Sequence, residues 1–206
     1  MPNLAYELPV SEQDYLMGEL NSPIKHEYID GVVYAMSGAS AAHNRLAGNI
    51  YLAFANHLKG NPCQPYTSDM KVKVGSKYFY PDVLVDCTDL DDNSYFSEQP
   101  SIIVEVLSKS TRQLDKTTKL DSYIQIPTLQ EYVLIEQEHA EIAVLRRATG
   151  WRAEYYFLGD TITLNSIDLT ISVEDIYQRV KNSDMLQWLE RKAQEEEQLQ
   201  ADSASH

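Results

Sequence analysis

The chain has 206 residues, 43% of them hydrophobic, which suits one domain with a substantial core and an appendage. Its formal net charge of −14 at pH 7 counts against broad electrostatic binding of nucleic acid, which depends on Lys and Arg at the phosphates. Residues 181–206 hold three bases and six acids, so the C-terminus does not account for the acidity.

The sequence indicates no membrane segment and no secretory signal. No window approaches the ~18 apolar residues of a membrane helix. The first ten residues lack a basic segment followed by an apolar core. Two cysteines, Cys63 and Cys87, make neither a disulfide framework nor a zinc site. We therefore expect a reducing cytoplasm, with Cys87 as a small core residue.

A short helix and a hairpin are predicted first. Ser11 is suited to cap the helix, with Asp14 at the capping-box position. Residues 25–36 are typical of a hairpin, because Asp30 and Gly31 lie between β-rich flanks and favour a tight turn.

A longer helix is predicted from Ser40 to about Lys59, where a Gly-Asn-Pro run ends it. One apolar face of this helix is expected to pack on the core. That face contains Leu46, Ile50, Ala53, Phe54 and Leu58.

Short strands and one further helix follow. Alternating and apolar runs predict the strands, and Pro127 ends the helix, which begins near Leu114. The predicted strands are Lys71–Val74, Tyr78–Val85, Ser101–Leu107, Glu131–Ile135, Ile142–Arg146, Trp151–Phe157, Thr161–Leu164 and Leu169–Ile171, with an acidic loop from Thr88 to Pro100. A terminal helix is expected from Val173. We assign residues 1–180 to one domain and residues 181–206 to a helical, acidic tail.

Two acidic residues interrupt strands that are otherwise apolar, Asp82 and Glu105. Burying an ionised carboxylate is costly unless it is paired or binds a metal. Neighbouring strands lie about 4.8 Å apart, so both carboxylates can reach one ion. Oxygen ligands of this kind suit Mg²⁺, with Mn²⁺ as a substitute. The pair therefore predicts a metal-dependent phosphodiesterase site.

A lysine near such a metal can position water or stabilise charge on the phosphate. The residue two positions after Glu105 faces the same side of the strand, but it is Leu107. Lys119, on the following helix, is the candidate, and it shares a helix face with Asp115. The alternative is that Asp115 and Lys119 form an ordinary surface pair.

The order of these motifs resembles the PD-(D/E)XK nuclease superfamily, and within it the bacterial family described as putative restriction endonucleases. The resemblance runs from about Tyr15 to Glu136. It rests on six segments: His26–Gly31, Ser40–His43, Tyr80–Val83, Ile103–Thr111, Asp115–Leu120 and Glu131–Tyr132.

The resemblance implies an α/β, restriction-endonuclease-like core, with a mixed central β-sheet flanked by α-helices. It also implies Mg²⁺ and a DNA-cleaving role. RNA is an alternative substrate, because it presents the same phosphodiester. It carries Asp82 and Glu105 over as metal ligands, and Lys119 as the migrated counterpart of the superfamily's strand lysine. Cleaving both strands of a duplex requires two sites, so a homodimer is expected. The alternative is a catalytically inactive module of the same fold that binds nucleic acid or protein.

Two further residues are candidates for contacts with the substrate or the metal. Glu27 can supply a third carboxylate, or it can form an ionic contact at the hairpin edge. His43 can touch a phosphate, or it can be a capping or surface histidine. Any DNA contact would use local basic residues, for which the candidates are Lys71, Lys73, Lys77, Lys109, Arg112, Lys116 and Lys119. The alternative for most of these is an ordinary solvated position.

Overall fold

A mixed six-stranded sheet forms the centre of the protein in the computed structural model, which describes residues 9–204. Strand β8 lies parallel to β9, and the other neighbours are antiparallel. Across the sheet the order is β11 (Ala153–Phe157), β10 (Glu141–Arg146), β9 (Glu131–Glu136), β8 (Pro100–Leu107), β6 (Val83–Asp86) and β3 (Gln64–Thr67). The predicted mixed sheet flanked by helices is confirmed.

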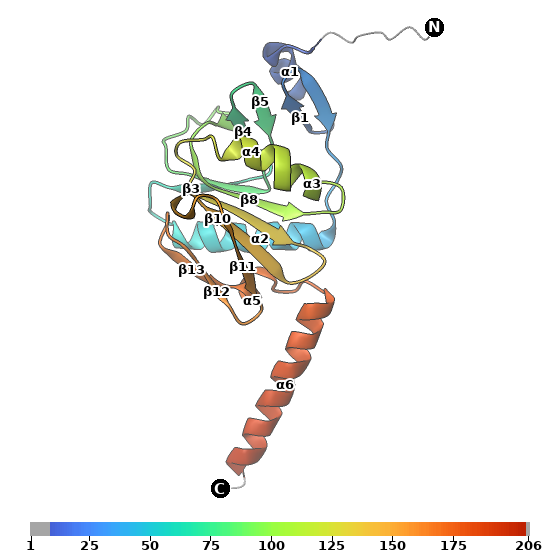
Figure 1. Ribbon diagram of the computed structural model, residues 1–206, viewed down its shortest axis with the longest axis vertical. Helices are drawn as coiled ribbons and strands as arrows, with labels where there is room; N and C mark the ends of the chain where they lie inside the picture. Colours follow the sequence, from blue (N-terminus) through green and yellow to red (C-terminus); the bar gives the residue numbers. More distant parts are fainter. Residues whose placement is uncertain (1–8, 205–206) are drawn as a thin grey trace, which may run out of the picture.

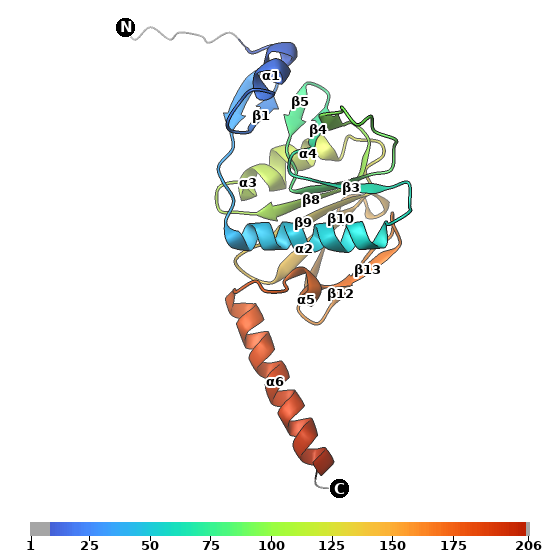
Figure 2. The same ribbon diagram turned by 180° about the vertical axis from the view of Figure 1, so that it is seen from behind.

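Helices cover both faces of this sheet (Figures 1 and 2). Helix α2 (Ala41–His57) buries Phe54 in the same core cluster as Val104. On the opposite face, Tyr123 packs in a second cluster with Ile103. Successive residues of β8 thus point to opposite layers, as the period of a strand requires. Glu105 of β8 contacts Lys119 in the helical layer that contains Tyr123, and Asp82, just before β6, contacts His43 of α2 in the other layer.

The helix predicted near Leu114 contains a wide π-helical turn. It comprises α3 (Arg112–Leu114), the π-helical η1 (Asp115–Lys119) and α4 (Leu120–Tyr123). Single π-helical turns are rare and occur frequently at functional sites. Both charged residues of interest on this helix, Asp115 and Lys119, lie in that turn.

A second sheet, which the sequence pattern did not predict, has the order β2-β1-β5-β4-β7. It contains β1 (His26–Ile29), β2 (Val32–Ala35), β4 (Lys71–Val74), β5 (Lys77–Phe79) and β7 (Phe96–Ser97). The predicted hairpin is confirmed, since Asp30 and Gly31 have φ of 49° and 95° between β1 and β2. Helix α1 (Glu12–Glu19) begins where Ser11 caps it.

The predicted strand Tyr78–Val85 is wrong as a single element. Its two halves, β5 and β6, belong to different sheets, and Tyr80, Pro81 and Asp82 lie between them. Proline has no backbone N–H to donate to a sheet ladder, which favours a break here. Asp82 consequently lies at the junction of the two sheets, just before β6.

The C-terminal part differs from the predicted terminal helix. Strands β12 (Thr161–Leu164) and β13 (Leu169–Ser172) pair with each other, and α5 (Val173–Ile176) is one turn long. Arg179 has a φ of 63°, which a helix does not accommodate. Helix α6 (Ser183–Ala204) then extends away from the body (Figure 1). Within residues 9–204, every helix is too short or too polar to span a membrane.

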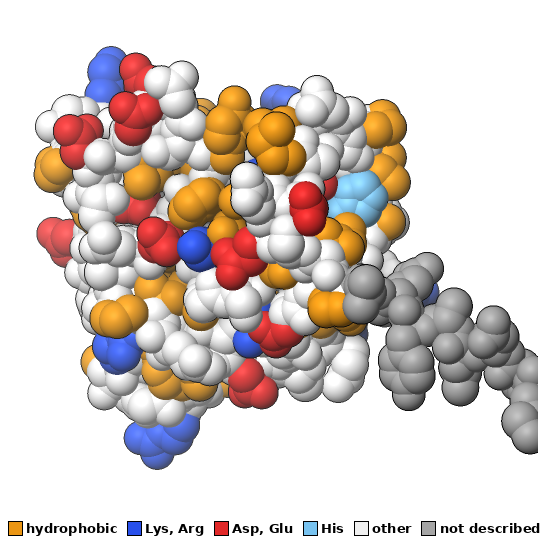
Figure 3. All heavy atoms as spheres, turned by 90° about the horizontal axis from the view of Figure 1, so that it is seen from above, with side chains coloured by type: hydrophobic (Ala, Val, Ile, Leu, Met, Phe, Trp, Pro, Cys, Tyr) orange, Lys and Arg blue, Asp and Glu red, His pale blue; other side chains and the backbone are white. Residues whose placement is uncertain are grey.

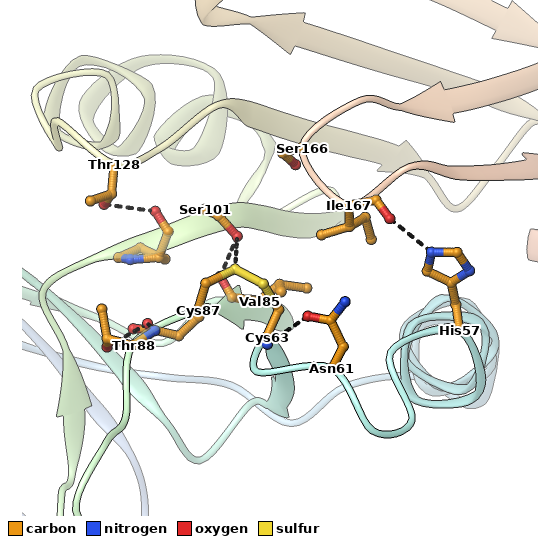
Figure 4. The surroundings of a disulfide bond; sticks show 12 residues. His57, Asn61, Cys63, Val85, Cys87, Thr88, Ser101, Thr128, Ser166 and Ile167 are labelled. Carbon is orange, nitrogen blue, oxygen red and sulfur yellow. Dashed lines mark hydrogen bonds between the residues drawn. A yellow bond between two sulfur atoms is a disulfide. The ribbon is translucent and has the colours of Figure 1, made fainter.

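The two cysteines form a disulfide, contrary to the expectation of unpaired thiols (Figure 4). Gln64 of β3 pairs with Asp86 of β6, and the next opposed residues are Cys63 and Cys87. The register of two neighbouring strands therefore brings the sulfurs together. Cys87 is exposed, so its predicted place in the core is also wrong.

Candidate active site

Asp82 and Glu105 lie next to each other because β6 and β8 are neighbours. Val83 pairs with Val104, and continuing this register by one residue places Asp82 opposite Glu105. The Asp82 Oδ2 accepts a hydrogen bond from the Val106 N–H at 2.7 Å. Both acids line a cavity of about 690 Å³. The predicted pair therefore shares one cavity wall.

Lys119 lies at the centre of a buried cluster of carboxylates. Its Nζ is 2.9 Å from Glu27 Oε1, 3.0 Å from Glu105 Oε1 and 3.2 Å from Asp115 Oδ1. The side chain is only 4% exposed. A surface pair between Asp115 and Lys119 is therefore wrong, because both side chains are buried.

Burial and the neighbouring charges shift the pKa values of Glu105, Asp115 and Lys119 in this cluster. Burial raises the pKa of Glu105 well above its ordinary value, and the Lys119 ammonium offsets this only in part. Burial likewise raises the pKa of Asp115. Burial alone would lower the pKa of Lys119, but Glu105, Glu27 and Asp115 outweigh it and raise that pKa well above its usual range. The Lys119 ammonium therefore stays charged, and it is shared by the carboxylates of Glu27, Glu105 and Asp115.

Two buried tyrosines brace this cluster. The Tyr123 hydroxyl donates to Glu105 Oε1 at 3.2 Å, and the Tyr132 hydroxyl donates to the backbone carbonyl of Asp115 at 3.0 Å. Both side chains are fully buried. Tyr123 was not predicted as a site residue, although residues 115, 119 and 123 follow one another at intervals of four and therefore share one side of the helix.

His43 and Glu27 occupy different positions around the cavity. His43 lies in the first turn of α2, where Ser40 caps the helix, and its Nε2 is 3.3 Å from Asp82 Oδ2. Burial lowers the pKa of His43, but its contact with Asp82 outweighs this and raises it. Glu27 accepts from the Tyr80 N–H and is buried behind Lys119, outside the cavity lining.

Most of the candidate basic residues are already engaged within the described part of the chain. Lys73 contacts Glu12 and Glu98, and Lys77 contacts Asp30. The same holds in the turn and helix after β8, where the pairs are Lys109–Glu138, Arg112–Glu136 and Lys116–Glu136. Lys71 is buried against the Tyr80 ring. In Figure 3, basic and acidic side chains are interspersed over the face shown. A continuous basic patch is therefore absent from that face.

A second group of ligand-type residues contains Glu136, His139 and Glu141, whose side-chain atoms lie within 4.8 Å of one another. Arg112 and Lys116 each contact a different oxygen of Glu136. Because two cations already neutralise that carboxylate, this group is less suited to a dication than the wall formed by Asp82 and Glu105.

Comparisons with known proteins agree with this architecture. The sequence profile of the family Uma2, described as "Putative restriction endonuclease", matches residues 12–174. "Uncharacterized protein slr1290" of Synechocystis is 36% identical over 173 residues, which cover 82% of this chain and 91% of that protein. "Uncharacterized protein sll1609" of the same organism is 39% identical over 129 residues, covering 60% and 73% respectively.

A solved structure is also similar in fold. It is a putative nuclease of the DUF820 family from Anabaena variabilis, with a TM-score of 0.70. The match covers 84% of this chain and all of that chain, at 16% sequence identity. At this identity, the likeness establishes the shared fold alone.

Proposed function

Because the chain belongs to the Uma2 family of restriction-endonuclease-like proteins, we propose that it is a Mg²⁺-dependent endonuclease that hydrolyses phosphodiester bonds of DNA. One observation carries this proposal: Asp82 and Glu105 share the wall of a cavity into which Lys119 also projects from a neighbouring helix. Carboxylates and an ammonium around one cavity are suited to hydrolysis of a phosphodiester.

The residues present fit a divalent ion. Asp115 Oδ1 is buried and forms no hydrogen bond, although the Lys119 ammonium is 3.2 Å away. Three carboxylates around that ammonium leave an excess of two negative charges when all are ionised. An oxygen-rich, negatively charged site suits Mg²⁺ or Mn²⁺. We assign Asp82 and Glu105 as the residues that would hold the ion, which supplies activation of water and neutralisation of phosphate charge.

Lys119 is assigned to stabilise charge on the reacting phosphate. The carboxylates keep its ammonium charged, and its burial fixes where that charge lies. A fixed cation needs little reorganisation as negative charge develops, which makes it effective in a site that excludes water. Glu27 contacts this ammonium from outside the cavity lining, and we assign it to orient Lys119.

His43 is assigned to contact the substrate. It lines the same cavity as Asp82, and its side chain retains 13% exposure. A raised pKa favours the protonated imidazole, which can donate to a phosphate oxygen.

A second candidate function is a catalytically inactive module that binds nucleic acid or protein. The net charge of −14 and the ion-paired basic residues favour it. Activity on RNA is a third outcome, since RNA presents the same phosphodiester.

The direct test is cleavage of plasmid, single-stranded DNA and RNA at low salt, with Mg²⁺, Mn²⁺ or chelator. We expect metal-dependent cleavage by the wild-type chain and its loss in Asp82→Ala. Asp69→Ala is the matched control, because Asp69 is 84% exposed and lies outside the cavity lining. Cleavage by Asp82→Ala at the wild-type rate contradicts the assignment. Absence of cleavage on every substrate, including a library of target sequences, favours the binding module.

We further propose that residues 1–180 contain the nuclease domain, that residues 181–206 are an appended acidic tail, and that the chain acts as a cytoplasmic homodimer. A reducing cytoplasm would keep Cys63 and Cys87 as thiols. Two copies would supply the two sites that duplex cleavage requires. Leu186, Leu189 and Leu199 of α6 are exposed and offer apolar surface for association. Sedimentation of the full chain and of a chain ending at residue 182, which lacks all three leucines, tests this. A monomer at every concentration contradicts the homodimer.

A further inference from the structure

Glu105 receives two hydrogen-bond donors from one helix, and both bind the same oxygen. The Lys119 ammonium donates to Oε1 at 3.0 Å, and the Tyr123 hydroxyl donates to Oε1 at 3.2 Å. The second oxygen, Oε2, forms no hydrogen bond with the described residues. The carboxylate is therefore held by one oxygen only, in a residue that also lines the cavity.

Tyr123 is held in a fixed orientation. Its ring packs edge-on against Phe79 and against Tyr132, with centroid distances of 5.4 Å in both contacts. A phenol has one O–H donor, and the Tyr123 hydroxyl directs it to Glu105 Oε1 at 3.2 Å.

We infer that Tyr123 is a positioning residue, which holds Glu105 Oε1 so that Oε2 is left to ligate the metal ion. This inference rests on the proposed function. Carboxylates that bind metals are themselves hydrogen-bonded in most sites, and these outer contacts set the orientation of the ligand. With the hydroxyl removed, Glu105 retains a single donor, Lys119, which two other acids also attract.

The variant Tyr123→Phe removes one oxygen atom and keeps the ring. Loss of such an outer contact typically costs about tenfold or more in metal affinity. We expect calorimetric titration with Mg²⁺ alone to show a loss of about tenfold in affinity. In cleavage assays, the Mg²⁺ concentration for half-maximal rate should rise, while the KM for DNA stays unchanged.

Tyr132→Phe is the matched control. Tyr132 is as buried as Tyr123 and packs against the Tyr123 ring. Its hydroxyl, however, donates to the backbone carbonyl of Asp115 and not to Glu105. Mg²⁺ affinity of this control should stay close to that of the wild-type chain. Equal Mg²⁺ affinity in all three proteins overturns the inference. An equal loss of affinity in both variants also overturns it, because the effect would then not come from the hydrogen bond to Glu105.

A double-mutant cycle of Tyr123→Phe and Glu105→Gln tests the contact independently. Urea unfolding without metal gives the free energy of unfolding of each variant in the cycle. The effects of Tyr123→Phe and Glu105→Gln should be non-additive if the hydroxyl acts through Glu105. Additive effects overturn the inference. If the wild-type chain itself binds no Mg²⁺, the proposed function fails, whereas the cycle still decides whether Tyr123 orients Glu105.

Discussion

Lys119 is one ammonium that three buried carboxylates share, so its removal leaves charges without a partner. Breaking a buried ion pair from one side commonly costs about 3–5 kcal/mol. We expect Lys119→Met to lower the free energy of unfolding by about that amount at neutral pH. Urea unfolding followed by circular dichroism measures the change.

The same variant should recover stability in acid. The pKa values of Glu105 and Asp115 are already raised in the folded chain, and without Lys119 they should rise further. An acid with a raised folded pKa makes the folded state bind extra protons, so stability falls as pH rises above its unfolded pKa of about 4. The deficit should therefore be smaller near pH 5 than near pH 8. Lys109→Met is the control, because Lys109 is 82% exposed and its loss should change little. A deficit independent of pH contradicts the argument.

The acids of the site were predictable from the sequence, whereas the tyrosine that holds Glu105 was not. Asp82 and Glu105 each lie in an apolar run of the sequence, where a charged residue calls for a partner or a metal. The sequence does not distinguish Tyr123 from a tyrosine that only packs in the hydrophobic core, because tyrosines on the apolar face of a helix are common. Its contact with Glu105 depends on how the helix packs on the sheet, which local patterns do not specify.

At the scale of single elements, the turn between β1 and β2 depends on one glycine. Gly31 has a φ of 95°, and a Cβ added there would lie 2.6 Å from the Cβ of Pro9. We expect Gly31→Ala to lower the free energy of unfolding by about 2 kcal/mol, because both the backbone and the contact are strained. Thermal and urea unfolding measure it.

Gly18→Ala is the matched control for that substitution. Gly18 lies in α1, and nothing lies within 4 Å of the position of an added Cβ. Alanine favours a helix over glycine by up to about 1 kcal/mol, so this change should be neutral or slightly stabilising. Equal destabilisation by both substitutions would show that the turn is not specially constrained.

Elements set by local chemistry were predictable, whereas partners across the chain were not. Ser11 and Ser40 cap their helices as expected, because a cap requires only the next three residues. The division of Tyr78–Val85 depends on two sheets that meet at Pro81. The pairing of Cys63 with Cys87 depends on the register of β3 and β6. Neither fact can be obtained from a single segment.

For the molecule as a whole, the disulfide closes a loop of chain between residues 24 apart in sequence. Closing a loop of that size restricts the unfolded chain and commonly stabilises the fold by about 3 kcal/mol. We expect reductant, or the double variant Cys63→Ser/Cys87→Ser, to lower the free energy of unfolding by this amount. Reductant should leave the double variant unchanged. Two titratable thiols in the folded, oxidised protein contradict the pairing.

Alkaline pH acts on the whole molecule through its buried tyrosines. Burial raises the pKa of Tyr15, Tyr80, Tyr123, Tyr132 and Tyr177 above the ordinary value. A raised folded pKa means that the folded chain keeps protons which the unfolded chain releases near pH 10. Stability is therefore intact below about pH 10 and falls above it, by up to about 1.4 kcal/mol per pH unit for each such tyrosine.

We expect these five tyrosines to ionise only when the protein unfolds. Near-ultraviolet absorbance of the native chain should show part of the fourteen tyrosines titrating first, followed by a steep step that coincides with loss of circular dichroism. In urea, all fourteen should titrate together near pH 10. A single smooth titration of the native chain near pH 10, with the fold retained, would mean that water reaches these hydroxyls. The packing around Glu105 would then be looser than its contacts with Lys119 and Tyr123 require.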